Sequence, residues 1–339
     1  MTDTTTAVLP PTTDAAKPTP RSLKSAPVIA DRVFRTTAYA AGTITVAVML
    51  AVGIFLTARA GDALAVAGPS FLTTQEWSPE TGTFGVAAVL FGTVTIALVA
   101  MAISVPLAIG TALLISEIVP PRARGLLITM VDLMAAVPSV VFGLWGVFFL
   151  QAGVIPVAQW ISTYFGWIPI FRVADETGAR LTDAGAYTSS AFIAGIVVAL
   201  MVVPTQTSVM REAFSQAPLG EREGALALGS TRWGMIRAVV LPFGRGGIIG
   251  GTMLGLGRAL GETIAVVMII SPIFTINTEL LKTGTNSVSA LIALRYGEAS
   301  QFGLSALMAA GLVLFIITLI VNFTASTIVA RSRSGAESN

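Results

Sequence analysis

Two ionisable residues stand inside one of the apolar segments of this sequence, where charge is scarce. Arg258 and Glu262 lie four positions apart within the segment 243–272, so a continuous helix would carry both on one face. Each charge costs roughly 2.5–3.5 kcal/mol at the centre of a membrane helix unless it faces water or a partner. Intramembrane ionisable pairs usually mark a substrate path, so we expect this pair to line one; mutual neutralisation as a purely structural pair is the alternative.

A third intramembrane charge and a row of glycines accompany this pair. Asp132 lies near the cytoplasmic end of the apolar segment 126–150, and it is a further candidate for the path. It lies only about 10 Å inside the segment, so contact with interfacial water is the alternative. Gly247, Gly251 and Gly255 form a small-residue ladder on the side of the charged pair, which allows close helix packing. A face that is both glycine-lined and ionised predicts a subunit or cavity interface.

A charged loop, residues 211–242, precedes the segment that carries the pair. Its residues 218–228 predict a short helix, with a proline and two glutamates near the start and Gly229 as the stop signal. Ser230 or Thr231 can cap the helix that follows. About ten residues cannot cross a bilayer, so the short helix must lie outside it. A capped helix with a small-residue face is more typical of a docking element than of a solvated connector.

Composition indicates the class of protein that must position these residues. Hydrophobic residues make up 54% of the 339 residues and charged residues only 11%, against about 25% charged in soluble domains, so this is an all-α integral membrane protein. We expect a disordered basic tail over 1–37 and a second tail over 330–339. The first apolar run is too long for the core of a signal peptide, so we expect it to be a retained accessory span. Six spans are predicted in all, at 38–58, 84–115, 126–150, 188–210, 243–272 and 303–329.

Lysine and arginine set the expected orientation. They concentrate in the N-terminal tail and in the loop 211–242, and they are fewer in the segments on the other side of the membrane. The positive-inside rule therefore predicts that both termini and the charged loop are cytoplasmic. The long outer link at 151–187, rich in proline and aromatic residues, is expected to be interfacial and partly helical.

The charged loop resembles the EAA loop of ABC-transporter permeases, which forms the coupling helix that sits in a groove of the cytoplasmic ATPase. The departure is a glycine where the family more often has alanine, which weakens the helix by roughly 0.5–1 kcal/mol but keeps its face small. The matching positions are Glu223, Gly224, Ala225, Gly229, Leu241 and Pro242.

The run G-L-G-R-A-L-G-E-T over 255–263 is similar to the fifth-helix motif of PstC-type permease subunits of phosphate-specific ABC importers. Sulfate and molybdate permeases commonly have Phe-Gly where Thr263 and Ile264 stand here. The run P-S-V-V-F-G-L-W-G over 138–146 also resembles this group. The resemblance covers residues 84–329, and it implies that the fifth-helix arginine and glutamate move phosphate.

This resemblance implies a type I ABC importer permease core in the bacterial plasma (inner) membrane, without a cofactor of its own. The implied partners are a second, related permease subunit, two ATPase subunits, an extracytoplasmic phosphate-binding protein and the membrane lipid, with no nucleic acid. Phosphate at neutral pH still carries a proton, which Glu262 can accept while it competes for the Arg258 guanidinium. Sulfate has no such proton, so the pair would favour phosphate.

Other function classes make different demands on the chain. No Gly-Lys pair occurs, so there is no P-loop, and the chain has neither His nor Cys. We therefore expect no enzyme activity here and ATP hydrolysis in a partner subunit. A permease for another oxyanion of the sulfate or molybdate class is one alternative. A proton-coupled secondary transporter that uses Glu262 and Asp132 as a relay is another, and a membrane scaffold would explain the docking loop but not the buried charges.

Overall fold

A computed structural model describes residues 29–175 and 177–334 of the chain. By its internal contacts the chain divides into two units, residues 1–51 and 52–339. The first unit holds the start of helix α1 (Ile29–Ala67), and the second holds its end and all later helices. Most of the tail predicted for 1–37 lies outside the described residues. Its last part does not fit the prediction, because the helix already begins at Ile29.

The described residues are mostly helical, as the composition predicts. The two short strands, β1 (Trp77–Ser78) and β2 (Thr83–Phe84), form one antiparallel hairpin in which Trp77 pairs with Phe84. Beyond α1, the helices are α2 (Ala87–Leu113), α3 (Pro121–Ala136), α4 (Ser139–Trp145), α5 (Gln151–Phe165), α6 (Ala191–Ser215), α7 (Leu219–Ala227), α8 (Arg232–Met235), α9 (Leu241–Phe243), α10 (Arg245–Gly261), α11 (Ile264–Ile269), α12 (Val288–Arg295) and α13 (Gln301–Ser334).

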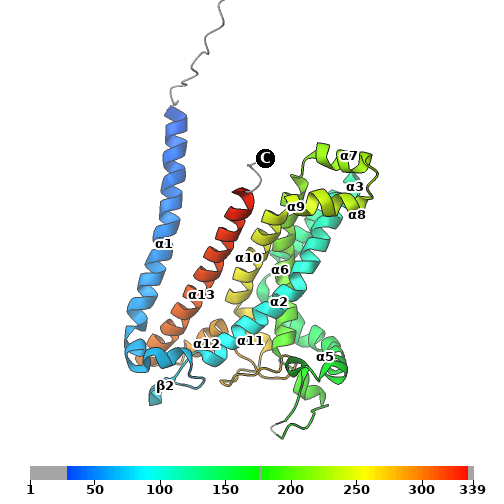
Figure 1. Ribbon diagram of the computed structural model, residues 1–339. Coiled ribbons are helices and arrows are strands. Elements are labelled where there is room, and N and C mark those ends of the chain that lie inside the picture. The colour runs from blue at the N-terminus through cyan, green and yellow to red at the C-terminus, as the bar shows by residue number, and fades with distance from the viewer. Residues whose placement is uncertain (1–28, 176, 335–339) are drawn as a thin grey trace, which may run out of the picture. The chain divides into compact units, whose positions relative to one another are not determined.

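Helix α6 is the centre of the second unit. It packs along α2 and α10, and most of its inward side chains are fully buried. Small residues on α2, such as Ala97 and Ala100, allow the two helices to approach closely. Figure 1 shows α7 and α8 at one end of this bundle and α5, α11 and α12 at the other. The bundle therefore separates the charged loop from the segment that carries Glu262.

The third predicted span, 126–150, is misplaced. Val137 is extended before Pro138, as expected of a residue that precedes proline, and this ends α3. The helix that is long enough to cross a membrane runs from Ser139 to Phe165 and includes the π-helical turn η4 (Gly146–Leu150). The first half of the predicted outer link 151–187 therefore belongs to this span.

The fifth predicted span, 243–272, is broken twice. Gly244 separates α10 from the preceding helical segment with a bend of 67°, and a side chain there would collide with the ring of Phe214. At the other end α10 stops at Gly261, after 17 residues. Among the described residues, five helices meet the length and apolarity of a span, or six if the bent pair counts as one. The number of spans agrees with the prediction only if this bent pair is included.

Candidate functional site

The charged loop folds as its sequence predicts. Helix α7 ends where Gly229 adopts a φ of +84°, a conformation that favours glycine. The Ser230 hydroxyl donates to the carbonyl of Ala225 at 2.7 Å, and this bond closes the turn. Thr231 then caps α8, because its hydroxyl oxygen accepts from the amide of Gly234 at 3.1 Å. Of the two candidate caps, Thr231 is therefore the N-cap and Ser230 satisfies the end of α7.

The outer face of α7 is open. Glu223 and Gly224 are exposed, and a β-carbon built on Gly224 meets no atom within 4 Å. Large apolar side chains flank this small-residue face, with Leu219 68% and Leu228 91% exposed. Leucine side chains this exposed outside the apolar segments are typical of a surface that another protein covers. Leu241, in contrast, packs against the buried cluster under the loop, and Pro242 beside it is exposed.

The inner face of α7 is held by a buried ion pair that the sequence analysis missed. Arg222 lies 3.2 Å from Glu117, and their side chains are only 17% and 4% exposed. Glu117 belongs to the π-helical turn η3 (Leu114–Ile118) that continues α2. The Arg222 guanidinium also donates to the carbonyl of Phe214 near the end of α6. One arginine therefore ties α7 to the ends of two membrane helices. An acidic residue that closes an apolar run, as Glu117 does, is the sequence signal that could have revealed it.

Arg258 and Glu262 do not lie on one helical face. Glu262 has an extended backbone (φ −66°, ψ 127°) in the break after α10. Its carboxylate accepts from the amide of Ala265 at 3.4 Å, and its carbonyl accepts from the Ser289 hydroxyl at 2.7 Å. These two hydrogen bonds satisfy a backbone amide and a backbone carbonyl that have no partner within the interrupted helix. The i, i+4 relation expected from a continuous helix is wrong here.

The two side chains do not neutralise each other in this structure. Among the described residues the ion pairs are Arg222–Glu117 and Lys282–Glu279. Arg258 is exposed and Glu262 half-buried in the isolated chain. Arg258 thus presents an exposed positive charge, and the only described bond of the Glu262 carboxylate is the long one from the Ala265 amide. Irregular backbone at membrane depth is expected where it lines a cavity or is buried in protein.

The glycine ladder of α10 faces α6 of the same chain. A β-carbon on Gly247 would collide with Ala213, and one on Gly255 would collide with the amide of Gln206. Gly251 lies between them, where a β-carbon would come within 3.1 Å of Met210. The ladder therefore serves packing inside this subunit rather than the contact between subunits that the sequence analysis considered.

Asp132 lies apart from the other two charges. It is exposed on α3, and its carboxylate accepts from the Ser208 hydroxyl of α6 at 3.4 Å. Residues 206–210 of α6 pack at the level of Gly251 and Gly255. From Gly251 to Arg258 is seven residues, or about 10 Å along a helix axis. The structure therefore places Asp132 nearer the charged loop than Arg258, and no described contact joins the three.

A strip of buried polar side chains between α2 and α6 was also missed. Ser104, Gln206 and Thr207 are each fully buried. The Ser104 and Thr207 hydroxyls and the Gln206 carbonyl oxygen have no hydrogen-bond partner within the described part of the chain. Each such atom costs about 1–3 kcal/mol. Isolated polar residues are common in membrane helices. The sequence therefore gave no signal that would have singled out these three.

Comparison with known proteins places the chain among membrane transport components. A family described as "Binding-protein-dependent transport system inner membrane component" matches residues 104–334. The "Phosphate transport system permease protein PstC" of Mycobacterium leprae is 40% identical over 329 residues, 95% of this chain and 99% of that protein. "PstC 2" of Mycobacterium tuberculosis is 37% identical over 309 residues, 90% of this chain and 93% of that protein.

A solved structure shares the fold. One chain of a bacterial ABC transporter involved in the import of the acidic polysaccharide alginate superposes with a TM-score of 0.53 at 17% sequence identity. The match covers 88% of this chain and 99% of that one. The helical arrangement is therefore that of an ABC importer permease.

Proposed function

Because the chain belongs to the binding-protein-dependent transport inner membrane components and, within them, to the PstC phosphate transport permeases, we propose that it conducts phosphate through the inner membrane as a subunit of an ATP-driven importer. It is a multi-pass membrane protein with a type I permease fold, and ATP hydrolysis resides in a separate subunit. The observation that carries the proposal is helix α7, which is open outward and tied inward to α2 and α6.

The partners are those of an ABC importer. An ATPase docks on the face formed by Glu223, Gly224 and Ala225, with Leu219 and Leu228 at its rim. A second, related permease subunit completes the path, and a phosphate-binding protein delivers the ion on the other side. Both termini and α7 are cytoplasmic, which the distribution of Lys and Arg supports. The permease core spans residues 84–329, and α1 is an accessory helix.

Coupling runs through the buried ion pair. When the ATPase moves α7, Arg222 carries the movement to Glu117 on α2 and to the carbonyl of Phe214 on α6. A charge-assisted bond in a site with little water is strong and directional. The ends of α2 and α6 therefore follow the docking helix. Helix α10 packs on α6 through its glycines, so the movement also reaches the broken helix end at Glu262.

The path uses Arg258 and Glu262, with Asp132 closer to the cytoplasmic side. Arg258 attracts the anion with a permanent charge and matched donors. Glu262 competes for the guanidinium and accepts a hydrogen bond from the oxygen of phosphate that is still protonated at neutral pH, so that binding stays weak enough for release. The buried polar strip of Ser104, Gln206 and Thr207 supports a path in this region, because unsatisfied polar atoms can be met by a polar ion or by water.

Substitution of Glu262 tests this path. In proteoliposomes that hold the complete transporter, Glu262→Gln should reduce the preference for phosphate over sulfate, because the neutral amide oxygen is a weaker acceptor for the phosphate hydroxyl than a carboxylate and its NH₂ group can donate to sulfate. Uptake of both ions is measured between pH 6 and 8, with Glu223→Gln, on the docking face, as the matched control. The same loss of selectivity in both variants would remove Glu262 from the path, and so would unchanged selectivity in Glu262→Gln.

A further inference from the structure

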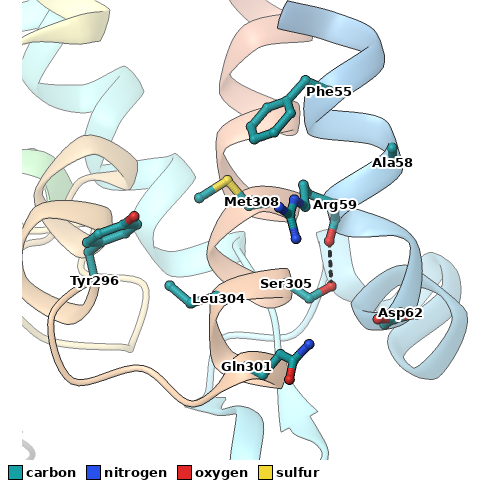
Figure 2. A pocket seen from close by; sticks show the side chains of 9 residues that line it. All are labelled: Phe55, Ala58, Arg59, Asp62, Tyr296, Gln301, Leu304, Ser305 and Met308. Atoms are coloured by element: carbon teal, nitrogen blue, oxygen red, sulfur yellow. Dashed lines mark hydrogen bonds between the residues drawn. The ribbon is translucent and has the colours of Figure 1, made fainter.

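A pocket of about 300 Å³ lies between the end of α1 and the start of α13, and neither Arg258 nor Glu262 lines it. Both walls belong to the second unit, where Ala60 and Ala63 pack against Ala306 and Ala309. Figure 2 shows side chains of both helices and Tyr296 around it. Its lining is mixed, with Phe55, Leu304 and Met308 as apolar members and Arg59, Asp62 and Gln301 as polar members.

The polar part of the pocket coincides with the ends of two apolar segments. No charged residue occurs in 36–58, and Arg59 and Asp62 are the first charges after that run. On the other wall, residues 299–330 contain no charge, and Gln301 stands at the start of this run. Two membrane helices thus change from apolar to polar at the same pocket. This is the position of the membrane–water interface.

Within the described part of the chain, the two charges in the pocket form no ion pair with each other or with another ionised group. Neither Arg59 nor Asp62 belongs to the ion pairs found among the described residues. The Arg59 guanidinium instead lies 5.7 Å from the centre of the Phe55 ring. The Ser305 hydroxyl is fully used by the backbone, because it donates to the carbonyl of Arg59 at 2.8 Å and accepts from the amide of Ala63 at 3.1 Å. These bonds fix the helix contact and leave the charged side chains available.

We propose that this pocket binds the headgroup of a zwitterionic phospholipid that carries a primary ammonium, of the ethanolamine type. Arg59 takes the phosphate and Asp62 the ammonium, and the start of an acyl chain lies along Phe55, Leu304 and Met308. A free oxyanion does not fit this site as well, because Asp62 repels it and the apolar wall gives it nothing. A positive and a negative group three residues apart on one helix match a ligand with both charges. The bound lipid would brace the end of α1, from Phe55 onward, against α13.

The proposal is tested on the complete transporter in nanodiscs by native mass spectrometry of retained lipid. Phosphatidylethanolamine, phosphatidylcholine and phosphatidylglycerol with identical chains are supplied in equal amounts. The ethanolamine lipid should be retained about three- to fivefold over the other two, the range that one partly exposed charge pair gives. Asp62→Asn should abolish the preference over phosphatidylglycerol, and Arg59→Gln should lower the retention of all three. Glu76→Gln, an exposed carboxylate outside the pocket, is the matched control and should change nothing.

Several outcomes would overturn the proposal. These are equal retention of phosphatidylglycerol and phosphatidylethanolamine, an unchanged preference in Asp62→Asn, and displacement of lipid by an extracytoplasmic protein that covers the pocket. If Arg59→Gln does not assemble, Arg59→Lys replaces it and should keep most of the lipid, because the charge remains. The result is independent of phosphate transport, since Arg59 and Asp62 lie outside the proposed path.

Discussion

Removal of the charge on Glu117 should uncouple ATP hydrolysis from transport. In Glu117→Gln the Arg222 guanidinium stays in its buried position without a counter-charge. Breaking a buried pair in this way typically costs about 3–5 kcal/mol. Arg222 keeps its bond to the carbonyl of Phe214 and some contact with water, so we expect about 3 kcal/mol, the low end of that range. This corresponds to a shift of about 150-fold in the equilibrium between attached and detached α7.

The assay is the ratio of phosphate taken up to ATP hydrolysed in proteoliposomes. The ratio should fall strongly in Glu117→Gln and in Arg222→Met, while ATP hydrolysis continues. Amide exchange of α7 should rise in the same variants, because the helix is released from α2 and α6. The exchanged pair Glu117→Arg with Arg222→Glu should recover part of the coupling. Recovery stays incomplete because a glutamate at 222 cannot donate to the Phe214 carbonyl.

The second described ion pair is the control. Lys282 and Glu279 lie 3.2 Å apart, and both also bond the backbone of Ala174 on the outer loop, so Glu279→Gln should leave coupling intact. The reasoning is refuted if Glu117→Gln keeps both the wild-type transport ratio and the wild-type exchange of α7. It is also refuted if the double-mutant cycle shows a coupling energy near zero.

Two further predictions concern the docking helix and an outer loop. Gly224→Ala should raise the free energy of unfolding by about 0.5–1 kcal/mol in thermal unfolding, because the added methyl meets no neighbour and favours the helix. Gly229→Ala should instead lower it by about 1–2 kcal/mol, because φ is +84° at that position. Equal shifts in the two variants would contradict this. On the outer loop, hydrogen bonds from the Thr177 hydroxyl and from the amides of Thr177 and Ala179 lower the pKa of Asp175 below its usual 3.8. The protection of these amides against hydrogen exchange should therefore persist as pH falls through 3.8 and be lost only below it. Protection is measured as the exchange rate corrected for the intrinsic rate. Loss of protection already near pH 5 would contradict the contacts.

The sequence predicts local features of this fold well where one residue type decides them. The end of α7 at Gly229 and the cap at Thr231 follow from backbone conformation and short-range hydrogen bonds, which leave a direct trace in sequence. Long apolar runs similarly locate α2, α6 and α13. The breaks at Pro138 and Gly261 are harder, because both lie inside apolar segments whose hydropathy does not change.

The site shows the same division. Arg258 and Glu262 attract notice because charge is rare in an apolar segment, but the break between them depends on contacts of Glu262 with Ala265 and Ser289. The Arg222–Glu117 pair joins residues 105 positions apart, so a local pattern can mark Glu117 as an unusual charge but cannot name its partner. Pairing over such a distance follows from the way α6 brings α7 back to the end of α2.

The most direct test of the account is ATP-driven uptake by the reconstituted transporter. Proteoliposomes with this chain, its related permease subunit, the ATPase and the phosphate-binding protein are supplied with ATP on the side of α7, and labelled phosphate is followed. We predict that phosphate accumulates against its concentration gradient. Orthovanadate should stop this accumulation, Arg258→Ala should abolish it, and collapse of the proton gradient should leave it unchanged. Uptake that resists orthovanadate, or that stops when the proton gradient is collapsed, would contradict the account.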